Sequence, residues 1–510
     1  MNEVPGLSRA ALHRARISRD ARFDGKFFIG VITTGVYCRP ICPSPQSKKS
    51  HVRYYVTAAA AAAAGYRPCR RCRPEVAPGS PAWLGPPAVV RRALRLINEG
   101  ALDDESVDQL ALHLGIGSRH LDRLFAMHVG VSPIAVAQTR RLHFAKQLLD
   151  ETNLPITRIA MTAGFGSLRR FNETYRATFR CTPRATRRRR GDAGRSSVDD
   201  EEVSLTLTYR PPYDWHSLAD FLRRHAIRGV ERVDCRGYAR TIRLGEGCAR
   251  ILVAPVVGQH ALRLHVSRVE PKDLFEIATT ARRVFDLTAD PAPIAEVLSH
   301  DPMLARLVTR HPGLRVPGVW DTFECAVRAV LGQNTSVAVA RTLGERLVER
   351  TGDRLSDAAD ELTHLFPSAE TLAGASLQGV GLTPAKTAAL RALARAVLNG
   401  DLQLAAPTDA LVARFSLLPR VTDWAGQYVA MRALAEPDAF PASDAVTRRA
   451  MAAARTPLSG EALQRRAERW RPWRSYATLH LWQQAVDARQ PRSGAVRPRT
   501  ARVLPLSAPD

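Results

Sequence analysis

Four of the eight cysteines of this 510-residue chain lie in Val36-Tyr37-Cys38-Arg39-Pro40-Ile41-Cys42 and Pro68-Cys69-Arg70-Arg71-Cys72. Three residues separate the first pair, two separate the second, and 26 lie between the pairs. Zinc prefers four soft ligands in a tetrahedron, and closely spaced cysteine pairs supply them. The spacing therefore predicts a four-cysteine zinc site. Spacing alone leaves open whether the zinc is structural, which is the commoner use, or activates a sulfur.

The residues around these cysteines resemble the amino-terminal domain of the adaptive-response activator Ada. The resemblance rests on FFIGVITTGVYCRP at 27–40 and GYRPCRRCRP at 65–74, and it covers nearly all of residues 1–77. It favours a reactive site, because the family moves a methyl group irreversibly from a DNA methylphosphotriester onto the cysteine that aligns with Cys38. It implies one Zn²⁺ with these ligands: Cys38, Cys42, Cys69 and Cys72. Arginines expected to hold the flanking phosphates are Arg39, Arg67, Arg70, Arg71 and Arg73.

Methyl transfer would also change the charge of the site. Four thiolates on one Zn²⁺ carry a formal charge of −2, which keeps the sulfurs deprotonated and nucleophilic at neutral pH. Methylation turns Cys38 into a thioether and removes one negative charge. DNA then approaches more easily, which is a mechanism for a damage-triggered switch.

Two helix-turn-helix patterns follow in tandem. Residues 106–118 predict a capped helix, a turn and a second helix, and residues 156–167 repeat this pattern. Small residues at the crossing and turn let the two helices pack closely. The pair, which covers residues 88–186, resembles the DNA-binding domain of AraC-type regulators. Its recognition helices are expected in the major groove, with four basic side chains singled out for DNA contact: Arg119, Arg123, Arg169 and Arg170.

The carboxy-terminal half resembles 3-methyladenine DNA glycosylase II, AlkA, over roughly residues 203–488. The resemblance rests on YRPPYDW at 209–215, PGLRVPG at 312–318 and AERWRPWRSYA at 467–477. It implies a small α+β domain followed by a helical region built around a helix-hairpin-helix element. The alkyltransferase half of the long form of Ada, with its Pro-Cys-His-Arg motif, has no counterpart here, so direct O6-methylguanine reversal is not expected.

The same resemblance assigns the residues of a glycosylase site. Asp444 falls on the family's catalytic position, whereas Asp438 precedes the Phe-Pro turn and is expected on the surface. Tyr428 and Trp482 align with positions of the base pocket. Trp320 is a further candidate pocket aromatic, although core packing is an equal alternative.

Two positions depart from the glycosylase family. Its hairpin usually reads Pro-Gly-Ile-Gly-x-Trp, whose glycines let backbone N–H groups approach a phosphate, but residues 419–424 read PRVTDW. The Arg420 side chain is expected to replace part of that contact, which Asp423 would oppose. The family's intercalating leucine is replaced by Asn334, a poorer wedge. We therefore expect a working active site that grips DNA less strongly.

Charge and composition agree with a polyanionic partner. The formal net charge is +25, from 74 Lys and Arg against 49 Asp and Glu. A surplus of this size favours nucleic acid. We find neither a signal peptide nor an apolar run long enough to span a bilayer, which predicts a cytoplasmic protein without a membrane partner.

Composition shifts near positions 80, 190 and 290 predict a multidomain chain. Strands are expected at residues 203–208, 250–257 and 261–266, with long amphipathic helices after 291. The expected domains are a small α/β zinc domain at 1–80, an all-α AraC-type tandem helix-turn-helix domain at 88–186, an α+β AlkA-like amino-terminal domain at 203–290, an all-α helix-hairpin-helix glycosylase domain at 291–488, and a disordered tail at 489–510.

The main hypothesis is a bifunctional alkylation-response protein. It would accept methyl groups from methylated double-stranded DNA, bind promoters, activate repair genes with RNA polymerase as a partner, and excise alkylated bases such as 3-methyladenine. A second hypothesis is a regulator only, whose degenerate glycosylase half merely binds DNA. A third is a structural-zinc transcription factor that senses a small molecule, which would require an unreactive Cys38.

Overall fold

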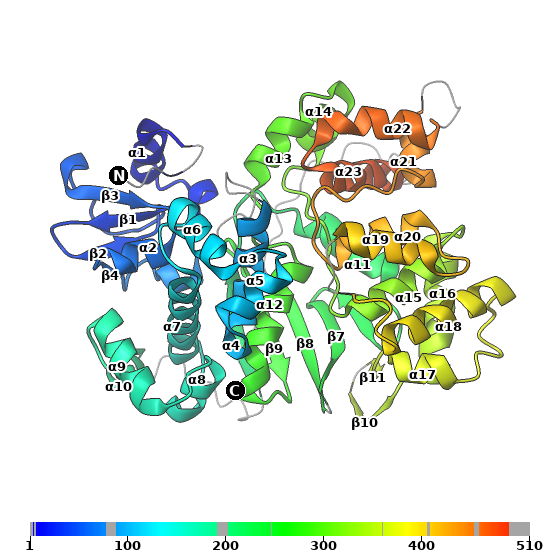
Figure 1. The fold of residues 1–510 in the computed structure, drawn as a ribbon, viewed down its shortest axis with the longest axis horizontal. Helices are drawn as coiled ribbons and strands as arrows, with labels where there is room; N and C mark the ends of the chain where they lie inside the picture. Colours follow the sequence, from blue (N-terminus) through cyan, green and yellow to red (C-terminus); the bar gives the residue numbers. More distant parts are fainter. Residues whose placement is uncertain are drawn as a thin grey trace, which may run out of the picture.

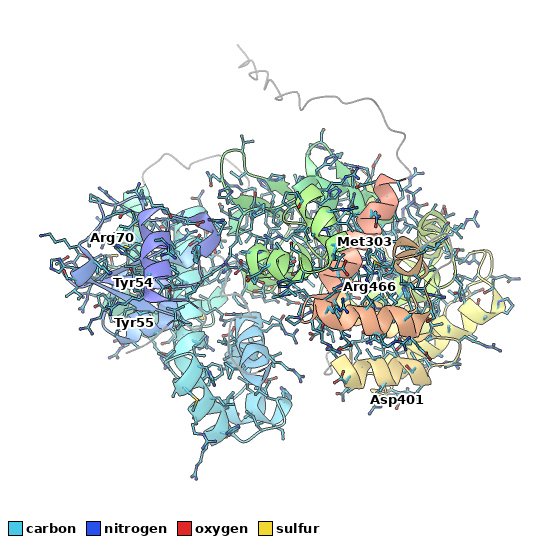
Figure 2. All side chains as sticks on the ribbon, turned by 90° about the horizontal axis from the view of Figure 1, so that it is seen from above. Tyr54, Tyr55, Arg70, Met303, Asp401 and Arg466 are labelled. Carbon is cyan, nitrogen blue, oxygen red and sulfur yellow. The ribbon has the colours of Figure 1, made fainter. Side chains whose placement is uncertain are left out.

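The computed structural model describes Val4 and residues 7–77, 88–190, 202–245, 247–359, 361–404, 408–452 and 458–488. The expected tail at 489–510 lies outside these residues. The chain forms two lobes, with the cysteine-rich domain at one end and the carboxy-terminal helices at the other (Figure 1). Seen from above, Tyr54, Tyr55 and Arg70 lie in the first lobe, and Met303 and Arg466 in the second (Figure 2).

A four-stranded sheet in the order β3-β1-β2-β4 forms the cysteine-rich domain. β1 is antiparallel to β2 and β3, whereas β2 and β4 run parallel. Gly30 at the centre of β1 leaves room for two rings, because a Cβ there would lie 2.8 Å from Tyr55 and 2.9 Å from Tyr66. The elements are α1 (Arg9–Ile17), β1 (Phe28–Val31), β2 (Val36–Cys38), β3 (Val52–Tyr55), α2 (Ala58–Ala63), β4 (Arg67–Pro68) and the 3-10 helix η3 (Pro74–Val76).

Two helix-turn-helix units follow, as predicted. Ser106 caps the first unit through a capping box with Gln109, and Ser167 caps the second recognition helix. Gly115 and Gly164 occupy equivalent turns with φ of 73° and 80°, a left-handed conformation that favours glycine. The helices are α3 (Ala88–Glu99), α4 (Ala101–Asp104), α5 (Val107–His113), α6 (Ser118–His128), α7 (Pro133–Glu151), α8 (Ile156–Thr162), α9 (Leu168–Phe179) and α10 (Pro183–Arg190).

A five-stranded antiparallel sheet in the order β5-β9-β8-β7-β6 comes next. The three expected strands are present, and β6 and β7 complete the sheet. Burial along β7 does not alternate, which explains why its sequence lacks the period-two pattern of a half-exposed strand. The elements are β5 (Glu202–Thr208), α11 (Trp215–His225), β6 (Glu231–Asp234), β7 (Gly237–Leu244), β8 (Gly247–Pro255), β9 (Ala261–Ser267) and α12 (Leu274–Val284).

Helices dominate the rest of the described chain. One departure from the expected all-α region is the antiparallel hairpin β10–β11, which also forms a bridge from Leu362 to Gly229 of the preceding domain. The elements are α13 (Pro291–Leu298), α14 (Pro302–Arg310), α15 (Thr322–Gly332), α16 (Val337–Thr351), β10 (Arg354–Ala359), β11 (Leu362–His364), α17 (Ala369–Gly374), α18 (Pro384–Leu398), α19 (Thr408–Leu417), α20 (Asp423–Arg432), α21 (Ala445–Ala450), α22 (Gly460–Ala467) and α23 (Arg474–Asp487).

The hydrophobic cores do not stop at the expected boundaries. One cluster joins the second helix-turn-helix unit to the five-stranded sheet. Phe144 of α7 and Phe275 of α12 meet edge to face within it, with ring centroids 5.1 Å apart. The regulator-like and glycosylase-like halves therefore bury apolar surface against each other, in addition to being joined by the chain. Within the described ranges, no helix has both the length and the apolar character needed to cross a bilayer.

Candidate functional site

The four predicted cysteine ligands meet at one edge of the amino-terminal sheet. The parallel register Tyr37↔Pro68 between β2 and β4 places the next residues, Cys38 and Cys69, side by side. Cys42 and Cys72 follow in the two turns. The four sulfurs lie within 4.8 Å of one another, and the backbone N–H of Arg39 donates to the Cys72 sulfur at 3.3 Å.

This donor set fits a soft, tetrahedral cation. Four thiols at such distances cannot all ionise alone: hydrogen bonds donated to neighbouring sulfurs raise the pKa of Cys38 and of Cys72, while the hydrogen bond from Cys38 lowers the pKa of Cys42 to about 6. A bound dication removes this conflict. Cys42 is half-exposed, whereas Cys38 is only 7% exposed. The assignment of Cys38 as methyl acceptor thus rests on the resemblance and not on accessibility.

Arg39 was expected to contact a phosphate, but its contacts in the structure are within the protein. Its guanidinium is buried, pairs with the Asp24 carboxylate and donates to the Cys72 carbonyl at 3.0 Å. Its function here is to brace the cysteine loop. Arg67 is half-buried, while Arg70 and Arg71 are exposed, and Arg70 Nη2 donates to the Phe179 carbonyl at 3.4 Å.

The cysteine domain is also held by both neighbouring domains. Tyr37, directly before Cys38, is hydrogen bonded through its hydroxyl to Nε2 of His143 on α7 at 2.8 Å. Burial lowers the pKa of His143 to about 4, so this imidazole is neutral at pH 7. On the other side, Lys26 pairs with Asp290, and Arg210 Nε donates to the Asp24 carbonyl at 2.7 Å. The cysteine domain thus contacts both the helix-turn-helix domain and the glycosylase-like half.

The candidate recognition helices α6 and α9 expose their basic residues. Leu121 and Phe125 of α6, and Phe171 and Tyr175 of α9, are buried at equivalent positions and leave the opposite faces to solvent. Arg169 pairs with Glu173 at 3.0 Å across one turn of helix, a weak exposed contact that a phosphate can displace. The residues predicted to contact DNA on these faces are all exposed: Arg119, Arg123, Arg169 and Arg170.

Asp444 lies at the amino terminus of α21, and its carboxylate accepts hydrogen bonds at both oxygens. Oδ2 accepts from the indole N–H of Trp424 at 3.0 Å. Oδ1 accepts from Trp482 Nε1 at 3.0 Å, and from the backbone N–H and hydroxyl of Thr447 at 2.7 and 2.8 Å. Indole N–H groups donate only, so the carboxylate is the acceptor throughout. Asp444 is held rigidly in an aromatic frame.

The rings of Trp424, Tyr428 and Trp482 form an aromatic wall beside Asp444. Of these three residues, Trp424 was not predicted from the sequence. Trp424 stacks on Tyr428 with ring centroids 4.9 Å apart, and Tyr428 lies 6.2 Å from the Trp482 ring. The signal was available, because Trp424 ends the hairpin motif. Trp320 is not part of this wall: it lines a cavity of about 260 Å³ beside the five-stranded sheet.

Asp438, expected on the surface, is half-buried and structural. It accepts from Arg474 Nε at 2.7 Å and pairs with Arg471. Trp470 and Trp473, from the same Trp/Arg-rich stretch, are buried in the core. This stretch therefore packs the helices, in agreement with the expectation that much of it is not catalytic.

The two positions that depart from the glycosylase family pattern lie on different loops: Arg420 in the hairpin between α19 and α20, and Asn334 in the loop after α15. Arg420 and Asn334 are both exposed and adopt positive φ, 63° and 54°. The N–H of Thr422 donates to Gln333 Oε1 at 2.6 Å. That amide, which a glycine-rich hairpin would present to a phosphate, is occupied here, so an exposed guanidinium at Arg420 is the available substitute.

A buried ionic cluster supports α15, which ends just before Gln333. Arg328 donates to Glu231 Oε2 at 2.5 Å and to Glu324 Oε1 at 2.8 Å, and Arg240 donates to Glu324 Oε2 at 2.7 Å. Burial raises the pKa of Glu231, but Arg328 and Arg240 outweigh it and lower the pKa to about 2. The cluster joins the antiparallel sheet to the helical region.

Glu231→Gln is expected to lower the free energy of unfolding by about 3–5 kcal/mol at pH 7, because it leaves buried guanidinium charge uncompensated. The carboxylate's contribution is complete above its unfolded pKa of about 4.5 and is lost as pH falls towards 2. Thermal melts from pH 7 to pH 2.5 should show the wild-type advantage shrinking below pH 4.5. Glu345→Gln, in a more exposed pair with Arg341, is the control. A pH-independent difference would contradict this account.

Each part of this architecture matches a known protein family. Family descriptions match in chain order: "Metal binding domain of Ada" at residues 11–75, "Helix-turn-helix domain" at 110–189, "AlkA N-terminal domain" at 204–321 and "HhH-GPD superfamily base excision DNA repair protein" at 327–475. The four cysteines are therefore the zinc site of an Ada-type domain.

Three relatives cover most or part of the chain. A Mycobacterium tuberculosis protein, "Probable bifunctional transcriptional activator/DNA repair enzyme AlkA", is 42% identical over 92% of this chain and 95% of its own length. Escherichia coli "DNA-3-methyladenine glycosylase 2" is 35% identical over 54% of this chain and 96% of its own length. Escherichia coli "Bifunctional transcriptional activator/DNA repair enzyme Ada" is 34% identical over 29% of this chain and 40% of its own length.

Proposed function

The chain belongs to the family of bifunctional proteins that join an Ada-type transcriptional activator to an AlkA-type DNA glycosylase, and from this membership we propose its specific reactions. It accepts a methyl group from a DNA methylphosphotriester on Cys38. It then activates alkylation-repair genes together with RNA polymerase. It also removes alkylated bases such as 3-methyladenine by hydrolysis of the N-glycosidic bond.

In the methyl transfer, the Cys38 sulfur gives an electron pair to the methyl carbon. The S–C bond forms as the O–CH₃ bond breaks, and the bonding pair leaves with oxygen, which restores the phosphodiester anion. Zinc, when bound by the four cysteines, keeps the sulfur deprotonated at neutral pH. The exposed Arg70 and Arg71 would pair with neighbouring phosphates. Because the thioether is stable, one chain repairs one lesion.

Methylation of Cys38 is expected to strengthen promoter binding by about 1–2 kcal/mol, or about tenfold, because one negative charge near the phosphates is lost. Fluorescence anisotropy on a promoter duplex at fixed salt measures this change. A non-specific duplex of equal length is the control. Equal promoter affinity before and after methylation would refute the switch.

In the glycosylase half, the observation that carries the proposal is the Asp444 carboxylate between two indole N–H groups. An alkylated purine is already cationic and leaves readily, so the enzyme mainly has to stabilise the developing oxocarbenium ion and orient water. A fixed carboxylate supplies that charge once the nucleotide is flipped out of the stack. The faces of Trp424, Tyr428 and Trp482 suit a cationic base.

The alternative is a regulator whose glycosylase half only binds DNA. The occupied Thr422 amide and Asn334 at the wedge position favour weaker DNA grip, but neither touches Asp444. Incubation of wild-type protein with alkylated duplex DNA, at enzyme excess and low salt, separates the two. Released 3-methyladenine supports the proposal, and no released base under these conditions supports the regulator alone.

A further inference from the structure

Two arginines from elsewhere in the chain hold the segment that ends α20, one at its C-cap residue Ala433 and one at Leu434, the next residue. Arg283 of α12 donates to the Ala433 carbonyl at 2.7 Å, and Arg95 of α3 donates to the Leu434 carbonyl at 2.6 Å. The chain then turns away through Ala435, whose φ is 50°. The last carbonyls of a helix lack intrahelical partners and carry partial negative charge, so guanidinium groups stabilise this end.

Arg95 reaches this position from the regulator domain. α3 buries Val90, Ala93 and Ile97 in the core of the first helix-turn-helix unit. The helix lies against α12 of the glycosylase half, as Figure 1 shows. One helix of the regulator thus holds the turn directly after α20, through a residue 339 positions later in the sequence.

α20 carries two of the three rings of the aromatic wall, those of Trp424 and Tyr428. Its first turn contains Trp424, which donates to Asp444, and its second contains Tyr428. Arg432, near its end, donates to the Tyr428 hydroxyl at 2.5 Å and to the Pro317 carbonyl at 2.8 Å. A shift of α20 along its axis would therefore move the indole N–H away from the carboxylate.

We propose that Arg95, a residue of the regulator domain, is a positioning residue for base excision. This inference rests on the proposed glycosylase function of Asp444. Together with Gln333 at the opposite end of the helix, Arg95 fixes α20 so that Trp424 and Tyr428 keep their geometry at the Asp444 carboxylate. The glycosylase half then depends on the regulator half for its full rate.

The test is single-turnover release of 3-methyladenine from alkylated duplex by the full-length chain, with DNA affinity and melting temperature measured on each variant. Arg95→Ala is expected to slow release about tenfold, because loss of fixed geometry acts on the chemical step, with little change in DNA affinity. Arg95→Lys should recover most of the rate. Arg140→Ala is the matched control, because Arg140 packs over the Phe275 ring at 4.1 Å across the same interface without touching α20.

The outcomes separate positioning from simple adhesion between domains. Slow release by Arg95→Ala, recovery by Arg95→Lys and a rate within about twofold of wild type for Arg140→Ala support the proposal. Wild-type rates in Arg95→Ala, or equal losses in Arg95→Ala and Arg140→Ala, overturn it. If Arg95→Ala unfolds below the assay temperature, Arg95→Gln replaces it, and equal rates for Arg95→Gln and Arg95→Lys overturn the role of charge. A wild-type protein that releases no base refutes the glycosylase function itself.

Discussion

Asp444→Asn is expected to slow the release of alkylated bases by about a thousandfold or more, because the developing oxocarbenium ion loses the fixed negative charge that Asp444 supplies. The substitution keeps α21 intact, since asparagine caps helices as well as aspartate does. It cannot keep both indole contacts, however. One side of the new amide is a donor and faces the N–H of Trp424 or of Trp482, so one indole is left without an acceptor.

The measurement is base release by chromatography, with DNA affinity and zinc content determined on the same preparations. The DNA affinity and the zinc content of Asp444→Asn should match those of the wild type. Asp438→Asn is the control, because it removes a carboxylate six residues away that pairs with Arg471 and Arg474. It should lower the melting temperature and leave base release within about twofold of wild type. Activity that survives in Asp444→Asn and disappears in Asp438→Asn would reverse the assignment.

Cys38→Ser is expected to eliminate methyl acceptance from methylated duplex DNA. A serine hydroxyl is a far weaker nucleophile at neutral pH than a zinc-bound thiolate, so no adduct should form. Intact-protein mass spectrometry should show one methyl group on each wild-type chain, without turnover, and none on the variant. Cys235→Ser, which changes an exposed cysteine outside the cluster, should accept one methyl like the wild type.

Peptide mapping identifies which cysteine carries the methyl group. Cys42 is more exposed than Cys38, so accessibility alone would favour methylation of Cys42. We expect the methyl group on Cys38. A methyl group found on Cys42, or on any cysteine in the Cys38→Ser protein, would contradict this expectation.

Features set by short spacing were predictable from the sequence. The four cysteines are brought together by two turns and one pair of adjacent strands, and the tandem helix-turn-helix units carry their own caps and glycine turns. Asp444 was assigned through the family resemblance, and its hydrogen bonds to two indoles lend that role physical support.

Features set by distant partners were not predictable. The sequence suggests that Arg39 binds a phosphate, but its buried guanidinium pairs with Asp24. Trp320 lines a cavity beside the five-stranded sheet and does not lie at Asp444. Asn334 occupies a left-handed backbone position, which asparagine tolerates better than most residues. The contact of Arg95 with Leu434 links residues of two domains, and no local pattern records it.

We propose that one chain carries two distinct alkylation-repair chemistries. The most direct measurement incubates the wild-type protein with methylated duplex DNA and reads the same sample twice, for protein mass and for free base. We expect one methyl group on Cys38 of each chain, together with release of 3-methyladenine that continues with time. A methylated protein with no free base, or free base with an unmethylated Cys38, would contradict this proposal.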